Sequence, residues 1–200
     1  MTEYRKTPKT NKKGRKLYGP THDKQTKYHD SGLWIKNRKR TYLYWYKFLQ
    51  ICLQFHDVDK NKYRGWDVGM IPDTKFDDWW KTHWKKLFGV KNRTDTPKYH
   101  TSSNRIKLES VRMSYLICVE DIKYETTSSN SEIGYKIIKR EMNNRYLSGS
   151  NLFFPQDSKG KLIHPDKLDE GQRLMVGQEI SRFKGRYKKI IKNVCNGTFP

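Results

Sequence analysis

Residues 168–194, with the sequence LDEGQRLMVGQEISRFKGRYKKIIKNV, carry the longest helical pattern of the chain. After Arg173, six apolar residues follow at alternating spacings of three and four and form one seam on a helix: Val176, Ile180, Phe183, Tyr187, Ile190 and Val194. Arg182 lies beside this seam, and five further basic residues cover the remaining surface: Lys184, Arg186, Lys188, Lys189 and Lys192. Such a helix can pack its seam on a core and present its basic side to phosphate groups.

A second helix is predicted over residues 74–89, TKFDDWWKTHWKKLFG. Its large side chains recur every three to four residues: Phe76, Trp79, Trp80, His83, Trp84, Leu87 and Phe88. Thr74 and Asp77 have the spacing of a capping box, and Gly89 suits the C-terminal end. We expect this row, Trp84 included, to be buried in the core rather than to form a cofactor cage, because exposed apolar patches of this size are rare.

Other segments carry shorter patterns. A broad aromatic row predicts a helix from about Leu33 to Phe55. The alternation of residues Val111 to Val119 favours a strand, with a helix as the open alternative. A short helix is expected from about Ser131 to Arg145, and residues 146–167 are expected to form a loop because glycine and proline recur there.

Together these patterns predict a mainly α fold, with an α+β arrangement that has only a minor strand element. Residues 31–200 are expected to form a single aromatic-rich helical domain that ends in the long basic helix. Residues 1–30 have almost no aliphatic side chains, so they cannot bury enough apolar surface to offset the entropy of ordering. We therefore predict a disordered basic arm there.

The charge of the chain is its strongest functional signal. Forty-two Lys and Arg stand against 21 Asp and Glu, for a net charge of +21. The surplus is concentrated at both ends, with +10 in residues 1–40 and +6 in residues 171–200, against +5 in residues 41–170. A surplus of this size is normally matched by a polyanion, and phosphate contacts gain affinity by releasing counterions.

These observations predict a nucleic-acid-binding protein without enzymatic activity, with DNA placed ahead of RNA as the partner. The phosphate contacts are expected from the arm, from the start of the first helix and from the last helix. The candidate residues are Lys12, Lys13, Arg15, Lys16, Arg38, Lys39, Arg40, Arg182, Lys184, Arg186, Lys188, Lys189 and Lys192. One alternative is a structural or assembly subunit of a larger viral or nucleoprotein complex, whose arm would enter an acidic partner or a packaged genome.

Motifs for catalysis and metal binding are incomplete. A metal-dependent nuclease remains a second alternative, on the condition that His56, Asp57 and Asp59 converge with other carboxylates. The same aspartates imitate an EF-hand, but its sixth position is Lys62 and its twelfth is Val68. His164-Pro165-Asp166-Lys167 matches the J-domain tetrapeptide without the basic helix that precedes it in that family, so Pro165 is expected at the start of the last helix.

No cofactor and no metal site are therefore expected. The three cysteines, Cys52, Cys118 and Cys195, are far apart in sequence and form no CxxC pair, which argues against a disulfide framework and a structural zinc site. Residues 1–16 are charged and lack the apolar region of a secretory signal, so a cytoplasmic location is expected, or a virion if the chain is phage-encoded. The longest apolar stretch, Tyr42 to Phe55, is too short and too polar to span a bilayer, so no membrane partner is expected.

Three segments carry a resemblance to other proteins. They are Phe76-Asp77-Asp78-Trp79-Trp80, Leu87-Phe88-Gly89, and Lys192-Asn193-Val194 with Gly197-Thr198-Phe199-Pro200. These segments resemble parts of uncharacterised proteins of phages and integrative mobile elements. The resemblance covers about a third of the chain and implies a viral or mobile-element setting, but it supplies no catalytic residue.

Overall fold

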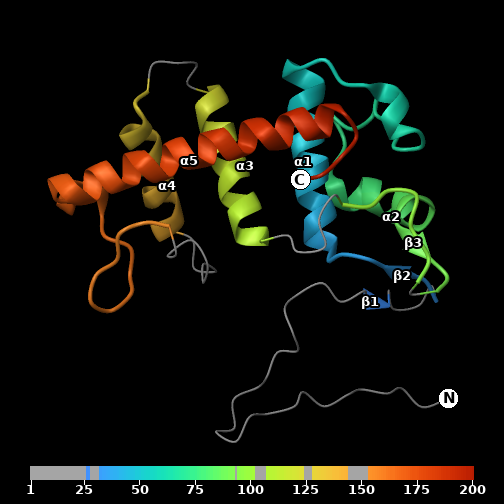
Figure 1. The fold of residues 1–200 in the computed structure, drawn as a ribbon, viewed down its shortest axis with the longest axis horizontal. Helices are drawn as coiled ribbons and strands as arrows, with labels where there is room; N and C mark the ends of the chain where they lie inside the picture. The colour runs from blue at the N-terminus through green and yellow to red at the C-terminus, as the bar shows by residue number, and fades with distance from the viewer. Residues whose placement is uncertain (1–25, 28–31, 93, 102–106, 124–127, 144–152) are drawn as a thin grey trace, which may run out of the picture.

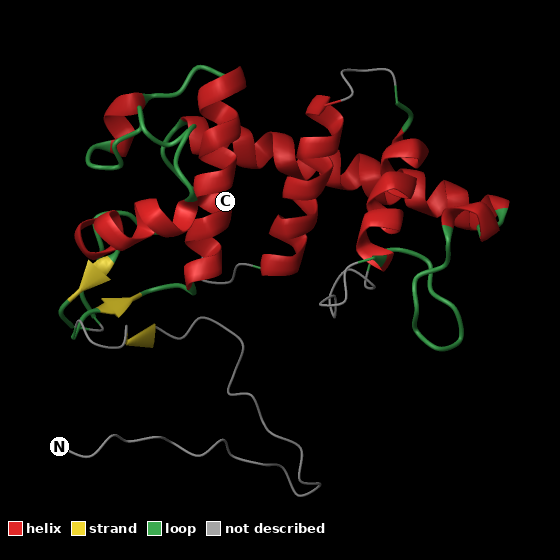
Figure 2. Cartoon of the chain, turned by 180° about the vertical axis from the view of Figure 1, so that it is seen from behind, coloured by secondary structure: helices red, strands yellow, loops and turns green. Residues whose placement is uncertain are grey.

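The computed structural model describes residues 26–27, 32–92, 94–101, 107–123, 128–143 and 153–200. Its longest element is helix α5 (Glu170–Cys195), which crosses α4 (Asn130–Met142), α3 (Leu108–Lys123) and α1 (Lys39–Phe55), as Figure 1 shows. The described residues are mainly helical and contain one small sheet (Figure 2). The predicted mainly α fold with a minor strand element is confirmed.

The small sheet corrects the predicted start of the first helix. Strands β1 (Thr26–Lys27), β2 (Trp34–Ile35) and β3 (Gly89–Val90) pair antiparallel in that order. Trp34 and Ile35 do not belong to α1, because β2 pairs with strands on both of its sides, and α1 begins only after its N-cap Arg38, whose backbone is extended. Asn37 is buried after β2, and its side chain donates to the hydroxyl of Thr101 at 3.0 Å, which ties the segment before α1 to the chain that precedes α3.

Helix α2 (Phe76–Leu87) forms where the aromatic row predicted it, but the predicted capping box is wrong. Lys75 occupies the N-cap position without a side-chain hydrogen bond. With the N-cap at Lys75, Thr74 and Asp77 are out of register for the box. Both contact α1: the Thr74 carbonyl accepts from the Tyr46 hydroxyl at 2.7 Å, and the Asp77 carboxylate is bound by Lys39 Nζ at 2.5 Å.

The predicted strand over Val111–Val119 is also wrong, because the segment lies inside α3. This helix contacts α1, α4 and α5, so apolar residues are needed on several of its sides. The buried set is Val111, Met113, Leu116, Ile117 and Cys118. Ser114 is buried among them and donates back to the Ser110 carbonyl at 2.8 Å. A helix that is apolar on several sides loses its clear period, and its sequence then imitates alternation.

Two capping boxes set the starts of the last two helices. Ser129 and Glu132 cap α4, so the helix predicted over 131–145 begins at Asn130 and ends at Met142. Asp169 and Gln172 cap α5, which places Leu168 before the helix. Pro165 starts a separate 3-10 turn, η4 (Pro165–Lys167), and not α5, because the extended backbone of Leu168 interrupts the chain between them.

The predicted loop over 146–167 is described from residue 153 onward. There it contains an isolated bridge between Gln156 and Leu162 before η4. The stretch compared with an EF-hand forms a polar turn, η2 (Lys60–Tyr63), in which Asp59 accepts from the Asn61 backbone at 3.1 Å. None of the described helices combines the length and apolarity that crossing a bilayer requires.

The core joins an aromatic cluster to the seam of α5. Trp45 on α1 stacks on Phe199 with ring centroids 5.6 Å apart and also contacts Trp66 and Tyr99. Its indole N–H donates to the Tyr63 hydroxyl at 3.1 Å, and that hydroxyl donates to a carbonyl of α5. Trp84 on α2 is buried at 5% exposure, as predicted.

The contact between α4 and α5 depends on one glycine, which yields a first prediction. A Cβ atom at Gly134 would lie 2.3 Å from Cγ1 of Val176, whereas a Cβ at Gly185, on the solvent side of α5, would meet nothing within 4 Å. Gly134→Ala should therefore lower the free energy of unfolding by about 1–3 kcal/mol. Gly185→Ala, the matched control, should raise it by about 0.4–1 kcal/mol. Urea unfolding of both variants would measure this, and equal effects would contradict the close packing.

The burial of Trp84 yields a second prediction. Trp84→Ala should cost about 3–5 kcal/mol of unfolding free energy, because the removed indole leaves a cavity in the core. Replacement of the exposed Lys81 on the same helix by alanine should cost less than about 1 kcal/mol. Thermal or urea unfolding would compare the two. A Trp84→Ala variant as stable as the parent chain would contradict the core position.

Candidate nucleic-acid interface

Helix α5 is fixed in place at its start and along one side. The Asp169 carboxylate accepts from the Gln172 backbone at 2.7 Å, and the Gln172 side chain accepts from the Asp169 backbone at 3.2 Å. Over 26 residues the helix extends about 39 Å. Its buried residues are Val176, Ile180, Phe183, Tyr187, Ile190, Ile191 and Val194. The opposite side of α5 is left to solvent.

All six cations predicted on this helix lie outside its seam. Five are exposed and Lys184 is half-buried; the exposed ones are Arg182, Arg186, Lys188, Lys189 and Lys192. No acidic residue occurs between positions 181 and 195. Cations stabilise a helix through its dipole only near the C-terminal turn, and Lys192 is the basic residue of that turn. The helix dipole therefore explains a stabilising role for Lys192 but not for the other five cations.

Two of these cations already have anionic partners. Arg182 binds the Glu179 carboxylate at 2.5 Å, and Lys184 Nζ lies 2.6 Å from an Asp121 oxygen on α3. For the other four, no carboxylate oxygen of the described residues lies within ion-pair distance: Arg186, Lys188, Lys189 and Lys192. These four charges are the ones that an external anion could neutralise.

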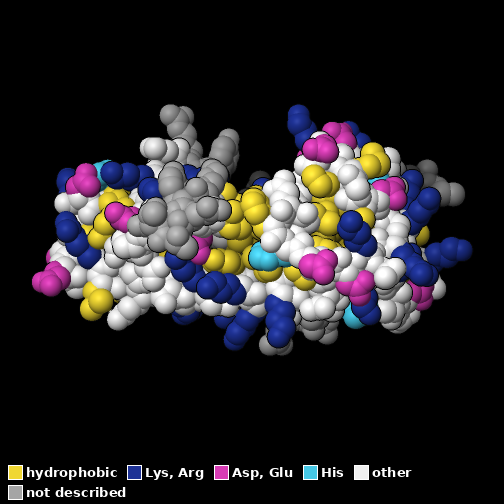
Figure 3. Space-filling view, turned by 90° about the horizontal axis from the view of Figure 1, so that it is seen from above, with side chains coloured by type: hydrophobic (Ala, Val, Ile, Leu, Met, Phe, Trp, Pro, Cys, Tyr) yellow, Lys and Arg dark blue, Asp and Glu magenta, His cyan; other side chains and the backbone are white. Residues whose placement is uncertain are grey.

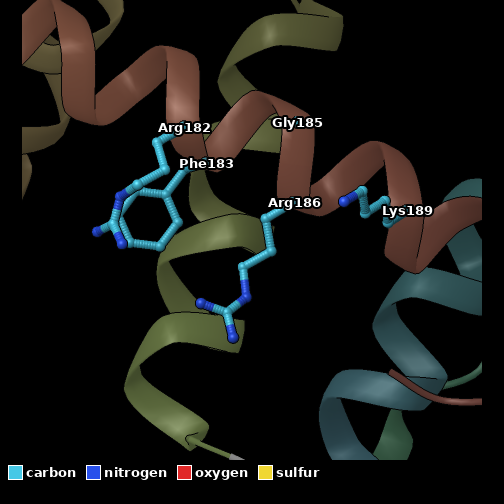
Figure 4. Close-up of a pocket in the computed structure, with 5 residues that line it drawn as sticks. All are labelled: Arg182, Phe183, Gly185, Arg186 and Lys189. Atoms are coloured by element: carbon cyan, nitrogen blue, oxygen red, sulfur yellow. The ribbon is translucent and has the colours of Figure 1, made fainter.

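One flank of α5 forms a shallow basic hollow. Arg182, Arg186 and Lys189 surround an open space of about 310 Å³ that also touches Phe183 and Gly185. Figure 4 shows Arg182 and Arg186 extending from the same side of the helix, with no side chain at Gly185 between them. Partial burial and the nearby Arg182 charge lower the pKa of the Arg186 guanidinium, so an anion in this hollow would relieve repulsion.

The other flank borders a larger, mostly apolar groove of about 550 Å³. Lys188 and Lys192 stand on the α5 side, and the groove continues to Ile122 on α3 and to His56 after α1. Figure 3 shows hydrophobic side chains gathered in a hollow at the middle of the upper face, with Lys and Arg side chains along one rim. Both flanks of α5 thus carry basic residues beside recessed surface.

The second predicted group, Arg38, Lys39 and Arg40, does not join this surface. It lies at the N-terminal end of α1, while α5 packs near the C-terminal end, where the Cys52 thiol contacts the Ile191 carbonyl. The 17 residues of α1 span about 26 Å. Lys39 is moreover bound to Asp77, with its ammonium near the rings of Phe76 and Trp80.

The remaining predicted contacts, Lys12, Lys13, Arg15 and Lys16, lie outside the described residues. Thr26 and Lys27, within the segment predicted as an arm, pair with β2 as strand β1. Sequence reasoning missed the recessed surface around Phe183 and Gly185. A glycine at an exposed position between two arginines is the signal that could have indicated it.

The two alternative functions, a metal-dependent nuclease and an assembly subunit, each require a feature that can be looked for in the described residues. His56 and Asp57 line the groove, whereas Asp59 caps η2, and no group of three or more His, Cys, Asp or Glu within the described ranges is placed to hold a metal ion. Exposed aromatic residues on α2 would have favoured an assembly subunit. Those residues are buried at 9% exposure or less: Phe76, Trp79, Trp80 and Trp84.

Comparisons with known proteins do not add to this description. No protein-family model, no curated protein and no solved structure matches the chain. The arrangement of charges on α5 is therefore the observation from which a function can be argued.

Proposed function

We propose that this protein binds nucleic acid electrostatically, without catalysis, through the solvent side of α5. The observation that carries the proposal is the set of six cations outside the buried seam, four of which have no carboxylate partner among the described residues. Such charges repel one another when the protein is alone. Phosphates would replace that repulsion with attraction and would release counterions.

The spacing of the cations favours DNA over RNA. Arg182, Arg186 and Lys189 lie on one flank, and Lys184, Lys188 and Lys192 on the other. Each row spans about 11–12 Å of helix. Within the rows, the cations without a carboxylate partner among the described residues are Arg186 with Lys189 and Lys188 with Lys192. Each of these pairs is about 5–6 Å apart along the helix axis, a spacing suited to about two phosphates of one strand. The major groove of B-DNA is about 12 Å wide and admits an α-helix, so the two rows would face phosphates of opposite strands. The major groove of A-form RNA is too deep and narrow for this.

Contacts of this kind position a protein on a duplex but carry no sequence information. The proposal therefore describes binding that tolerates many sequences. Lys12, Lys13, Arg15 and Lys16 would add further phosphate contacts, and the group at Arg38 would reach a different part of the polyanion because of its distance from α5.

The interface yields a third prediction, on salt dependence. Binding to duplex DNA should weaken steeply as salt rises, with a slope of about −0.9 in log affinity against log salt for each neutralised phosphate. The double variant Arg186→Ala/Lys189→Ala should bind more weakly and should make this slope shallower by about 1.8. Fluorescence anisotropy titrations at several salt concentrations would measure both quantities.

A matched variant separates the α5 surface from overall charge. Lys159→Ala/Lys161→Ala removes the same charge from an exposed loop that precedes η4. Its salt slope should equal that of the parent chain. If both double variants lose affinity equally, net charge alone drives binding and the proposed interface is wrong.

A fourth prediction concerns the segment before the sheet. Deletion of residues 1–25 keeps β1 and removes eight basic residues, among them Lys12, Lys13, Arg15 and Lys16. The shortened chain should keep the melting temperature of the parent, because the deleted stretch has almost no aliphatic side chains. Its affinity for DNA should fall. A large drop in melting temperature would instead mean that the segment packs on the helical domain.

A further inference from the structure

The three cysteines, widely separated in sequence, meet where α1, α3 and α5 come together. Cys52 on α1 and Cys118 on α3 are fully buried, and Cys195 is the last residue of α5. The Cys52 sulfur lies 3.9 Å from the carbonyl oxygen of Ile191, one turn before Cys195. The Cys195 thiol is near enough to Cys52 to raise the pKa of that thiol, and Cys118 acts on it in the same direction.

The three thiols differ in their access to solvent. Cys195 is partly exposed and lines the 550 Å³ groove, next to Lys192. Its position at the end of α5 leaves its side chain less confined than one in a helix interior, although the Cys195 carbonyl is held by the Asp59 backbone N–H at 3.0 Å. A small oxidant can therefore enter the groove and reach Cys195 before the two buried sulfurs.

We propose that Cys195 and Cys52 are a redox pair, which hydrogen peroxide converts into an intramolecular disulfide. The Cys195 sulfur attacks one peroxide oxygen, the O–O bond breaks, and the products are the sulfenic acid of Cys195 and water. The Cys52 sulfur then attacks the Cys195 sulfur. The S–O bond breaks, and the leaving hydroxide takes the Cys52 thiol proton to form a second water. Two thiols are oxidised by two electrons and one peroxide is reduced.

The local environment assigns different roles to the two cysteines of the pair. Burial raises the pKa of the Cys52 thiol well above its ordinary range, with the neighbouring Cys195 as a further cause, and burial raises that of Cys118 to about 12. Both buried sulfurs are out of reach of a dissolved oxidant, so peroxide reacts first at the accessible Cys195. Cys52 is the resolving residue because its sulfur lies against the Ile191 carbonyl, one turn before Cys195 on α5. Cys195 also raises the pKa of Cys52, whereas the causes that raise the pKa of Cys118 are burial and Asp121.

Peptide mapping of the full chain tests this proposal as a fifth prediction. The reduced protein is treated with hydrogen peroxide, the remaining thiols are alkylated in denaturant, and the protein is cleaved with trypsin. The three cysteines fall in different peptides, residues 48–60, 113–123 and 193–200. The expected product joins 48–60 to 193–200 with the loss of two hydrogen atoms, and dithiothreitol separates it. Peptide 113–123 should be recovered alkylated.

Matched variants distinguish the pair from general thiol oxidation. Cys52→Ala and Cys118→Ala each remove one fully buried sulfur, so their effects on stability are comparable. Peroxide should still yield the joined peptides in Cys118→Ala, whereas Cys52→Ala should give Cys195 sulfenic or sulfinic acid. In the parent chain, over-oxidised Cys195 with alkylated Cys52 would overturn the proposal. A disulfide that includes Cys118, or one that links two molecules, would overturn it equally.

Discussion

A buried chain of hydrogen bonds ties the aromatic cluster to the last helix. The Trp45 indole donates to the Tyr63 hydroxyl at 3.1 Å, and that hydroxyl donates to the Val194 carbonyl at 2.5 Å. Each group is buried, so a missing partner would leave a polar atom without compensation, at a cost of about 1–3 kcal/mol. Phe199, near the C-terminus, stacks on Trp45, and this stack together with the two hydrogen bonds forms the joint between α1 and α5. The position of α5 against α1 depends on this joint.

Once α5 is held there, its amphipathic pattern decides the character of the surface. The seam needs α1, α3 and α4 beneath it, and Gly134 allows α4 to approach closely enough for Val176 to be covered. The six cations of α5 lie outside this packed seam, on the part of the helix that borders solvent. The aromatic residues of α2 are buried in the core, so they are not available to stack on bases, and the exposed cations of α5 are the groups that a polyanion could contact.

The same joint brings together the groove and the cysteines. Cys52 and Cys195 meet where α1 ends and α5 ends, beside Lys188 and Lys192 on the groove rim. A disulfide there would bind the two helix ends covalently at the place where the hydrogen-bond chain already connects them. The proposed binding surface and the proposed redox pair are therefore neighbours, although neither requires the other.

The sequence by itself determined the amphipathic helices, because a 3.6-residue period is visible wherever a helix has one buried side. The seam of α5, its outward cations and the burial of Trp84 followed from that period. Only the tertiary structure decided the rest. Residues 111–119 are helical although they alternate, since neighbours on several sides remove the period. The convergence of the cysteines and the separation of Arg38 from α5 depend on how helices cross, which no local pattern encodes.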